Sequence, residues 1–371
     1  MIMSDKLNEN NKKLSELGET EILRKIIFPF HKQPEKLPYA LGDDCVDFPS
    51  NMLEDRIVWK IDPTPLPVSW LIGDPDYYTY GWYSVLINLS DIASMGASPF
   101  GLLLSVVAPP DMEVSEFKRF LKGVEDCCRA NDTYILGGNM KDGEEFSCTG
   151  TALGSVNSKK ILKRQGSNEG DLIVVIGELG AFWAAVFSKL NKLEIPAKYR
   201  KRLDTALNKP IPRLEEGQII SKNNLATACM DNSDSIVSCC YELAYQNNLD
   251  FVITINEEEI DSIYKDIFMK SGVKSLTAAF SWGDWNLVCT IPPNNFKELQ
   301  EKLENLCPVY KIGKVQKINN KLKNGSAYYI YNDELRLLNK EICSERFKEQ
   351  SYFTHGIYKY MEILKTQNLW I

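Results

Sequence analysis

The spacing of hydrophobic residues changes along the chain, and each change predicts a new element of secondary structure. Val58–Ile61 is a short, largely apolar run that predicts a strand ending at Asp62, because three prolines within the next five positions exclude a helix directly after it. From Thr79 onward, apolar residues recur every three or four positions, which is the period of a helix with one buried face. Gly96 and Pro99 end this predicted helix.

Strand and helix patterns continue beyond this helix in an order that does not repeat strictly. Further strands are predicted at Leu102–Val107, Tyr134–Leu136, Cys148–Val156 and Asp171–Gly177, and further helices at Glu19–Phe28, 117–124 and Ala181–Leu190. This mixed order favours an α+β fold in which helices are layered on a sheet.

The chain has 371 residues, which is too long for one small core and suits two packed domains. A polar, glycine-containing stretch from 157 to 170 predicts the boundary between them near residue 158. We therefore expect a flexible N-terminus, an N-terminal domain, an α+β C-terminal domain and a helical C-terminal extension, at residues 1–16, 17–157, 158–321 and 322–371.

Composition narrows the class of protein. Hydrophobic residues make up 44% and charged residues 25%, as in globular proteins. The net charge is −7 and no long basic run occurs, so we expect no nucleic-acid partner. The N-terminal residues contain no apolar signal segment, and the longest apolar stretch is about half of a membrane span. We expect a cytoplasmic protein without a membrane partner.

Candidate chemistry is concentrated in short acidic clusters at the ends of predicted elements. They are Gly42-Asp43-Asp44-Cys45, Ile61-Asp62, Asn88-Leu89-Ser90-Asp91, Gly137-Gly138-Asn139 and Asp231-Asn232-Ser233-Asp234. Asn88 and Asp91 lie three positions apart and share one face of the predicted helix, at the border of its apolar stripe. A carboxylate there is costly to bury unless it is paired or binds a cation. Mg²⁺ suits such scattered aspartates, because one or two carboxylates per ion suffice when phosphates supply the other ligands.

Other chemistry is excluded or absent. The chain has two histidines and no C-x-x-C pair, which leaves no pattern for zinc. It has neither the G-x-x-x-x-G-K-[ST] loop nor a G-x-G-x-x-G between a strand and a helix. If the protein uses ATP, it does so outside these phosphate-binding motifs.

Several motifs occur together in an order that resembles the thiamine-monophosphate kinase family over about residues 17–315. The most specific is Ile87-Asn88-Leu89-Ser90-Asp91-Ile92-Ala93-Ser94-Met95-Gly96-Ala97-Ser98-Pro99. Supporting motifs are Leu17-Gly18-Glu19, Gly42-Asp43-Asp44-Cys45, Ile61-Asp62, Leu136-Gly137-Gly138, Leu162-Lys163-Arg164-Gln165-Gly166, Pro210-Ile211-Pro212-Arg213 and Asp231-Asn232-Ser233-Asp234. The wider superfamily includes aminoimidazole ribonucleotide synthetase, selenophosphate synthetase and a hydrogenase maturation factor.

The resemblance implies a two-domain aminoimidazole ribonucleotide synthetase-like fold. It implies an N-terminal domain that binds ATP and Mg²⁺ and carries a mixed sheet. This sheet pairs with a partner's sheet in a homodimer, and an α+β domain follows in the chain. By position, the implied Mg²⁺ ligands are Asp44, Asp62, Asp91, Asp231 and Asp234, of which Asp44, Asp91 and Asp234 are the implied catalytic residues. The implied ATP contacts are Gly137, Gly138, Asn139, Arg164 and Ser233.

The sequence departs from the family mainly on the acceptor side. The family's His-Phe pair falls near Ser69 and Trp70, so the histidine is lost. On the metal side, Gly-Gly-Asp becomes Gly137-Gly138-Asn139, which removes one anionic metal ligand. The Gly-Gly-Glu-Asp-Tyr-Glu-Leu segment is replaced by one that includes Trp282, Asp284 and Trp285. We therefore place the substrate contacts at Ser69, Trp70, Trp282, Asp284 and Trp285.

These observations predict an ATP- and Mg²⁺-dependent phosphotransferase whose small-molecule acceptor, which can itself be a phosphate, differs from thiamine monophosphate. Two alternatives stay open at this point. One is an ATP-dependent ligase or cyclase of the same superfamily that activates a carbonyl or carboxylate oxygen. The other is a non-catalytic relative that binds nucleotide.

Overall fold

The computed structural model describes residues 12–17, 22–30, 53–54, 56–317, 325–343 and 356–371. The chain divides into two compact units, each with its own sheet. Unit 1 comprises Met1–Ile92 and Ser98–Ser158, and unit 2 comprises Ala93–Ala97 and Lys159–Ile371. The fold is α+β, as predicted.

Unit 1 contains a four-stranded mixed sheet in the order β1-β4-β2-β3. The strands are β1 (Arg56–Pro63), β2 (Ser98–Ala108), β3 (Ile135–Asp142) and β4 (Ser147–Val156). The helical elements are α2 (Leu14–Leu17), the π-helix Ile22–Ile27, α4 (Phe28–Phe30), α5 (Val68–Leu71), α6 (Tyr77–Ser94) and α7 (Val114–Ala130). β4 pairs antiparallel with β1 and β2, and β2 pairs parallel with β3.

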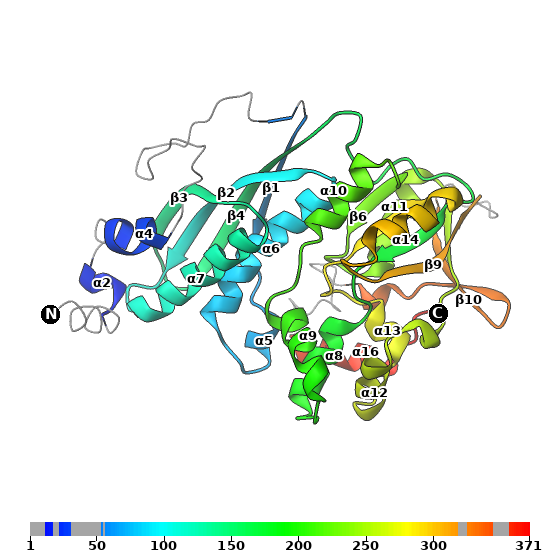
Figure 1. The fold of residues 1–371 in the computed structure, drawn as a ribbon. Coiled ribbons are helices and arrows are strands. Elements are labelled where there is room, and N and C mark those ends of the chain that lie inside the picture. Colours follow the sequence, from blue (N-terminus) through cyan, green and yellow to red (C-terminus); the bar gives the residue numbers. More distant parts are fainter. Residues whose placement is uncertain (1–11, 18–21, 31–52, 55, 318–324, 344–355) are drawn as a thin grey trace. The chain divides into compact units, whose positions relative to one another are not determined.

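Helices α6 and α7 cover one face of this sheet (Figure 1). They cross closely because each has a glycine at the contact. A Cβ atom at Gly81 would lie 2.1 Å from the Phe120 carbonyl oxygen, and one at Gly123 would lie 2.0 Å from the Tyr78 carbonyl oxygen. The opposite side of β1 carries exposed apolar side chains, because residues alternate between the two faces of a strand.

Unit 2 contains a seven-stranded sheet in the order β11-β10-β7-β9-β5-β8-β6. Its strands are β5 (Leu172–Ile176), β6 (Ala228–Asp231), β7 (Asp250–Ile253), β8 (Leu287–Ile291), β9 (Val309–Gln316), β10 (Ala327–Tyr331) and β11 (Glu334–Leu337). Among the described strands of this sheet, β7 and β10 pair in parallel and the other neighbouring strands pair antiparallel.

The helices of unit 2 lie between these strands in the sequence. They are α8 (Ala181–Leu190), α9 (Ala197–Asn208), α10 (Leu214–Lys222), α11 (Ile236–Asn247), α12 (Ser262–Lys270), α13 (Ser275–Ala279), α14 (Phe296–Leu303) and α16 (Ile357–Thr366), with short 3-10 turns at Glu257–Glu259, Pro293–Asn295 and Lys340–Ile342. Helix α11 packs against β6, β7 and β10. The largest buried aromatic side chains include Trp183, Phe182 and Tyr360.

The C-terminal extension, predicted to be helical, contains two strands as well as a helix. Residues 327–337 form the hairpin β10–β11, which extends the sheet of unit 2, and α16 follows later in the chain. Asn332 and Asp333 have φ angles of 49° and 61°, the left-handed conformation that a two-residue type I′ hairpin turn requires. The aromatic, β-branched sequence of β10 also favours a strand.

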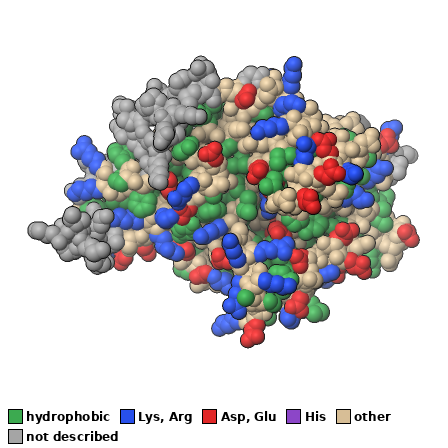
Figure 2. Space-filling view, in the orientation of Figure 1, with side chains coloured by type: hydrophobic (Ala, Val, Ile, Leu, Met, Phe, Trp, Pro, Cys, Tyr) green, Lys and Arg blue, Asp and Glu red, His purple; other side chains and the backbone are tan. Residues whose placement is uncertain are grey.

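Two other predicted boundaries change in the structure. The strand predicted at Tyr134–Leu136 continues through both glycines to Asp142, because it pairs in parallel with β2 along its length. The helix predicted at Glu19–Phe28 lies partly outside the described residues, and its described part is the π-helix followed by α4. Within the ranges given above, no helix combines the length and apolar character needed to cross a membrane. On the face drawn in Figure 2, basic and acidic side chains are interspersed.

Candidate functional site

Two of the predicted metal-binding aspartates meet at one lysine in unit 1. Lys60 and Asp62 lie two positions apart on β1, so their side chains point to the same face of the sheet. Asp91 comes from α6, which covers that face. The Lys60 Nζ atom lies 2.9 Å from Asp91 Oδ2 and 3.4 Å from Asp62 Oδ2. The two carboxylates therefore converge on a single cationic group.

Hydrogen bonds hold the end of β1 against α6. The Thr64 hydroxyl donates to Ser84 Oγ at 3.0 Å, and the Tyr80 hydroxyl donates to the Thr64 carbonyl oxygen at 3.1 Å. All three residues are buried. These contacts fix the separation between the strand that carries Asp62 and the helix that carries Asp91.

Asn88 lies on the same face of α6 as Asp91 and is fully buried. Its Nδ2 donates to the Ser84 carbonyl oxygen at 3.1 Å, whereas no hydrogen-bond donor of a described residue reaches its Oδ1. The amide packs against Gly150, which pairs with Asp62 across the β1–β4 ladder. A Cβ atom at Gly150 would lie 2.5 Å from Asn88 Nδ2, so glycine leaves room for the amide beside the aspartate.

The predicted nucleotide contacts of unit 1 lie on β3, at one end of the sheet order. Gly137, Gly138 and Asn139 pair with Leu103, Leu104 and Ser105 of β2. A Cβ atom at Gly138 would lie 2.1 Å from the Leu104 carbonyl oxygen, so the strand can approach β2 only with glycine there. Gly138 and Asn139 are exposed.

The remaining predicted polar residues belong to unit 2, where β6 leads into α11. Asp231 is buried at the end of β6, while Ser233 and Asp234 are exposed just before the helix. The Ser235 hydroxyl caps α11 by accepting from the Ser238 backbone N–H at 3.0 Å. The positive end of the α11 dipole therefore lies beside Ser233 and Asp234, an arrangement that favours anionic groups.

Arg164 lies along α11. Its Nη1 is 3.7 Å from Glu242 Oε1, and its backbone carbonyl oxygen accepts from Asn247 Nδ2 at 2.8 Å. Nearly half of its side chain is exposed, at 46%. The guanidinium is therefore accessible to a ligand, but its ion pair is a surface contact of little stabilising value.

The described metal-ligand candidates thus form two pairs, one in each unit. Asp62 and Asp91 share a lysine in unit 1, and Asp231 and Asp234 follow one another in unit 2. Asp44 lies outside the described residues. Among the residues that the structure describes, no three His, Cys, Asp or Glu side chains gather as a metal site on their own. The five-aspartate set stays a prediction.

The predicted acceptor residues of unit 1 lie on α5. Ser69 is buried, and no hydrogen-bond partner in the described ranges reaches its Oγ. Trp70 is half-buried and meets Tyr77 and Tyr80 of α6 edge-on, with ring centroids 4.9 and 5.9 Å apart. Trp70 is therefore part of an aromatic cluster at the start of α6.

In unit 2, the structure places Trp282 in the hydrophobic core. Its ring lies 5.1 Å from that of Trp183, 5.4 Å from Tyr360 and 5.7 Å from Phe182, and only 7% of the residue is exposed. These are the contacts of a packing residue. Trp285 is half-buried, with a left-handed φ of 53°. A substrate contact at either tryptophan stays a prediction.

Asp284 has a structural partner that the sequence did not indicate. Its two carboxylate oxygens accept from the backbone N–H groups of Gly180 at 2.6 Å and Phe182 at 2.7 Å, and so cap the start of α8 from outside the helix. The pKa of Asp284 is raised to about 7, mainly by burial and in part by nearby Glu178, against the opposing effects of the two N–H donors and Arg213. Asp284 is therefore a buried helix cap whose charge is costly.

Sequence reasoning missed Lys60 and a buried ion pair at the start of α10. Arg213 Nη1 lies 3.1 Å from Glu216 Oε1, and both side chains are 6% exposed. Lys60 could have been found from its two-residue spacing to Asp62 in a predicted strand, which places both side chains on one face.

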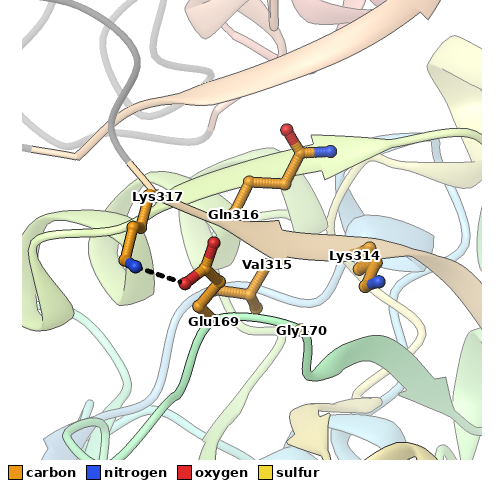
Figure 3. A pocket seen from close by; sticks show the side chains of 6 residues that line it. All are labelled: Glu169, Gly170, Lys314, Val315, Gln316 and Lys317. Carbon is orange, nitrogen blue, oxygen red and sulfur yellow. Dashed lines mark ion pairs between the residues drawn. The ribbon is translucent and has the colours of Figure 1, made fainter.

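A pocket of about 260 Å³ lies elsewhere in unit 2 (Figure 3). It is lined by Glu169, Gly170 and 314–317, and the Glu169 carboxylate pairs with Lys317 Nζ at 2.9 Å. None of the predicted site residues that the structure describes lines this pocket.

Comparison with known proteins first defines the class. Residues 42–156 match the family model of the AIR synthase related protein, N-terminal domain, and residues 168–321 match that of the C-terminal domain. Hydrogenase maturation protein HypE from E. coli has a similar structure, with a TM-score of 0.68 at 15% identity over 86% of this chain and 97% of that one. The chain thus has the two-domain AIR synthase-like fold.

The curated relatives then define the family. A thiamine-monophosphate kinase from Buchnera aphidicola is 30% identical over 289 residues, which is 76% of this chain and 86% of the relative. One from Pyrococcus horikoshii is 29% identical over 290 residues, 76% of this chain and 85% of the relative. The structure of AaThiL complexed with AMPPCP and TMP has a TM-score of 0.61 at 24% identity, covering 73% of this chain and 83% of that one. The chain belongs to the thiamine-monophosphate kinase family.

Proposed function

We propose that the protein transfers the γ-phosphate of ATP to a small-molecule acceptor, with Mg²⁺ held by its aspartates. Its curated relatives are thiamine-monophosphate kinases, and the protein is an ATP-dependent kinase of this family. The single structural observation that supports the chemistry is the convergence of Asp62 and Asp91 on one cationic group. A site that gathers two carboxylates around a cation suits a reaction between polyanions.

The residues fit magnesium by their donor chemistry. Asp62 and Asp91 supply hard oxygen atoms, and the buried Oδ1 of Asn88 lies on the same helix face as Asp91. Mg²⁺, when bound, neutralises the phosphate oxygens of the donor and the acceptor. In unit 2, Asp231 and Asp234 offer oxygen atoms of the same kind.

Phosphate binding has its own candidates in the two units. The glycines of β3 present an exposed strand edge without side chains, and Ser233 sits at the positive end of α11. Arg164 would bind phosphate oxygens through its planar guanidinium. If the acceptor is a phosphate oxyanion, it needs no general base, which agrees with a chain that has only two histidines.

We propose that the acceptor differs from thiamine monophosphate. Where the family has a histidine next to phenylalanine, this chain has Ser69 and Trp70, and Trp70 is packed on Tyr77 and Tyr80. Loss of a polar contact to a substrate can lower the kcat/KM for that substrate, relative to a competing one, by several powers of ten. The test is a coupled assay of ADP release with and without thiamine monophosphate. Little stimulation is expected, and a kcat/KM of about 10⁴ M⁻¹s⁻¹ or more would contradict the proposal.

We also propose a homodimer that pairs the sheets of two N-terminal domains. The support is an exposed apolar face of β1, where Ile57, Trp59 and Ile61 are 58%, 73% and 67% exposed. Light scattering should give about twice the chain mass of 42.2 kDa. Trp59→Glu should shift the population to monomers, while Met269→Glu, at an exposed apolar position of unit 2, should not. A wild-type protein that is monomeric at micromolar concentration would refute the proposal.

A further inference from the structure

The lysine between Asp62 and Asp91 has a defined place in the sheet. Lys60 pairs with Ala152 across the β1–β4 ladder, and its carbonyl oxygen accepts from Thr151 Oγ1 at 2.7 Å. Thr151 Oγ1 in turn accepts from Trp59 Nε1 at 2.8 Å. The backbone on both sides of Lys60 is therefore fixed, and the strand alternation directs its side chain toward the aspartates.

The Lys60 ammonium group lies within ion-pair distance of both carboxylates. It contacts one oxygen of each carboxylate, at 2.9 and 3.4 Å. The three side chains are 25% to 32% exposed, so their charges are only partly screened by water. Two aspartates this close repel each other unless a cation lies between them.

We propose that the Lys60 ammonium replaces one divalent cation between Asp62 and Asp91, so that this chain binds one metal ion fewer at unit 1 than its carboxylates would otherwise allow. The inference rests on the proposed function, because it assumes that these aspartates belong to a magnesium-dependent site. It deepens that function by assigning Lys60 as a positioning residue with a fixed positive charge.

The replacement has a chemical consequence. A covalently tethered ammonium brings one positive charge and cannot be diluted away, whereas a magnesium ion brings two and must be bound from solution. The pair of carboxylates with Lys60 therefore keeps a net negative charge, while the same pair with Mg²⁺ would be neutral. We expect this part of the site to be organised at Mg²⁺ concentrations too low to fill it with metal.

The test counts metal ions without any nucleotide. Mn²⁺ serves as the probe, and electron paramagnetic resonance measures the free ion during titration of the full-length protein. Lys60→Met keeps an unbranched side chain of similar length and removes its charge. In this variant, Asp62 and Asp91 should bind one additional Mn²⁺ per chain. Its affinity should be about tenfold or more above any binding of Mn²⁺ by the wild type at these two aspartates. Lys60→Arg keeps the charge and should retain the wild-type count.

Control variants separate this effect from general changes. Lys122→Met removes a lysine that pairs with Asp126 on α7, elsewhere in unit 1, and should leave the Mn²⁺ count unchanged. The double variant Lys60→Met, Asp62→Asn should lose the additional ion. Lys60→Gln is a second neutral variant in case Lys60→Met folds poorly, which circular dichroism reveals.

Two results would overturn the inference. One is an equal Mn²⁺ count in the wild type and in folded Lys60→Met or Lys60→Gln. The other is an additional ion that persists when Asp62 is also replaced. Failure of the proposed function would look different, since calorimetry with AMPPCP and Mg²⁺ would then detect no nucleotide binding by the wild type, whatever the metal count.

Discussion

Replacing Asp284 with asparagine should change how the stability of unit 2 depends on pH. The carboxylate accepts two backbone N–H groups at the start of α8, Gly180 and Phe182, in a buried place where ionisation is costly. Burial, with a smaller contribution from the Glu178 carboxylate, raises its pKa to about 7, although the two N–H donors and Arg213 oppose the shift. Asparagine has a similar shape, but it offers one acceptor oxygen and cannot ionise.

The sign and size of the effect follow from the pKa. Between about pH 4 and pH 7 the folded chain keeps the Asp284 proton that an unfolded chain has lost, so the stability due to this group falls as the pH rises and then levels off. At roughly 1.4 kcal/mol for each tenfold change in proton affinity, a rise from about pH 5 to about pH 8 should remove about 2 to 3 kcal/mol. The Asp284→Asn variant should not show this decrease in stability, because asparagine does not ionise.

The variant should therefore be less stable than the wild type by about 1 to 3 kcal/mol near pH 5, because one N–H group loses its acceptor. Near pH 8 the difference should shrink or disappear. Urea unfolding followed by tryptophan fluorescence suits the measurement, since Trp183 and Trp282 pack beside this segment. Asp266→Asn, at an exposed carboxylate on α12, should show no such convergence. A difference between wild type and Asp284→Asn that stays constant or widens with pH would refute the reasoning.

Three further changes test other parts of the structure. Gly138→Ala should destabilise the protein by about 1 to 3 kcal/mol in thermal melts. Gly137→Ala, whose Cβ would meet a leucine methyl group at 3.3 Å, should destabilise it by less than half as much. Equal losses of stability would contradict the strand geometry. Tyr360→Phe removes the hydroxyl shared with Ser281 and a carbonyl oxygen, and should lower stability by about 1 to 2 kcal/mol; an unchanged melting temperature would show that this bond contributes nothing. Asp91→Asn should abolish Mg²⁺-dependent ATP turnover with little change in melting temperature, and a fully active variant would exclude it as a metal ligand.

The elements with a clear hydrophobic period could be predicted from the sequence. The run before Asp62 became β1, and the apolar stripe after Thr79 became α6, because these local patterns agree with the final packing. The hairpin β10–β11 was missed, although Asn332 and Asp333 mark its turn, because its pairing partner β7 lies far away in the sequence. Such non-local pairing gives little local signal.

The sequence predicted individual residues of the site, but not the contacts between them. The sequence named Asp62 and Asp91 separately, and their common contact with Lys60 depends on the packing of α6 against β1. Asp284 was placed at the substrate because its segment departs from the family, whereas the structure shows it capping α8, which begins about a hundred positions earlier. Long-range backbone contacts of this kind cannot be deduced from spacing.

The transfer of phosphate itself tests the central claim most directly. The protein would be incubated with Mg²⁺, ATP labelled at the γ-phosphate and a mixture of small metabolites, and the products separated by chromatography. We predict that the label moves to a small-molecule acceptor, that ADP forms in equal amount, and that Asp91→Asn stops the transfer. Label that stays in ATP, or that appears only as inorganic phosphate while ATP is consumed, would contradict a phosphotransferase.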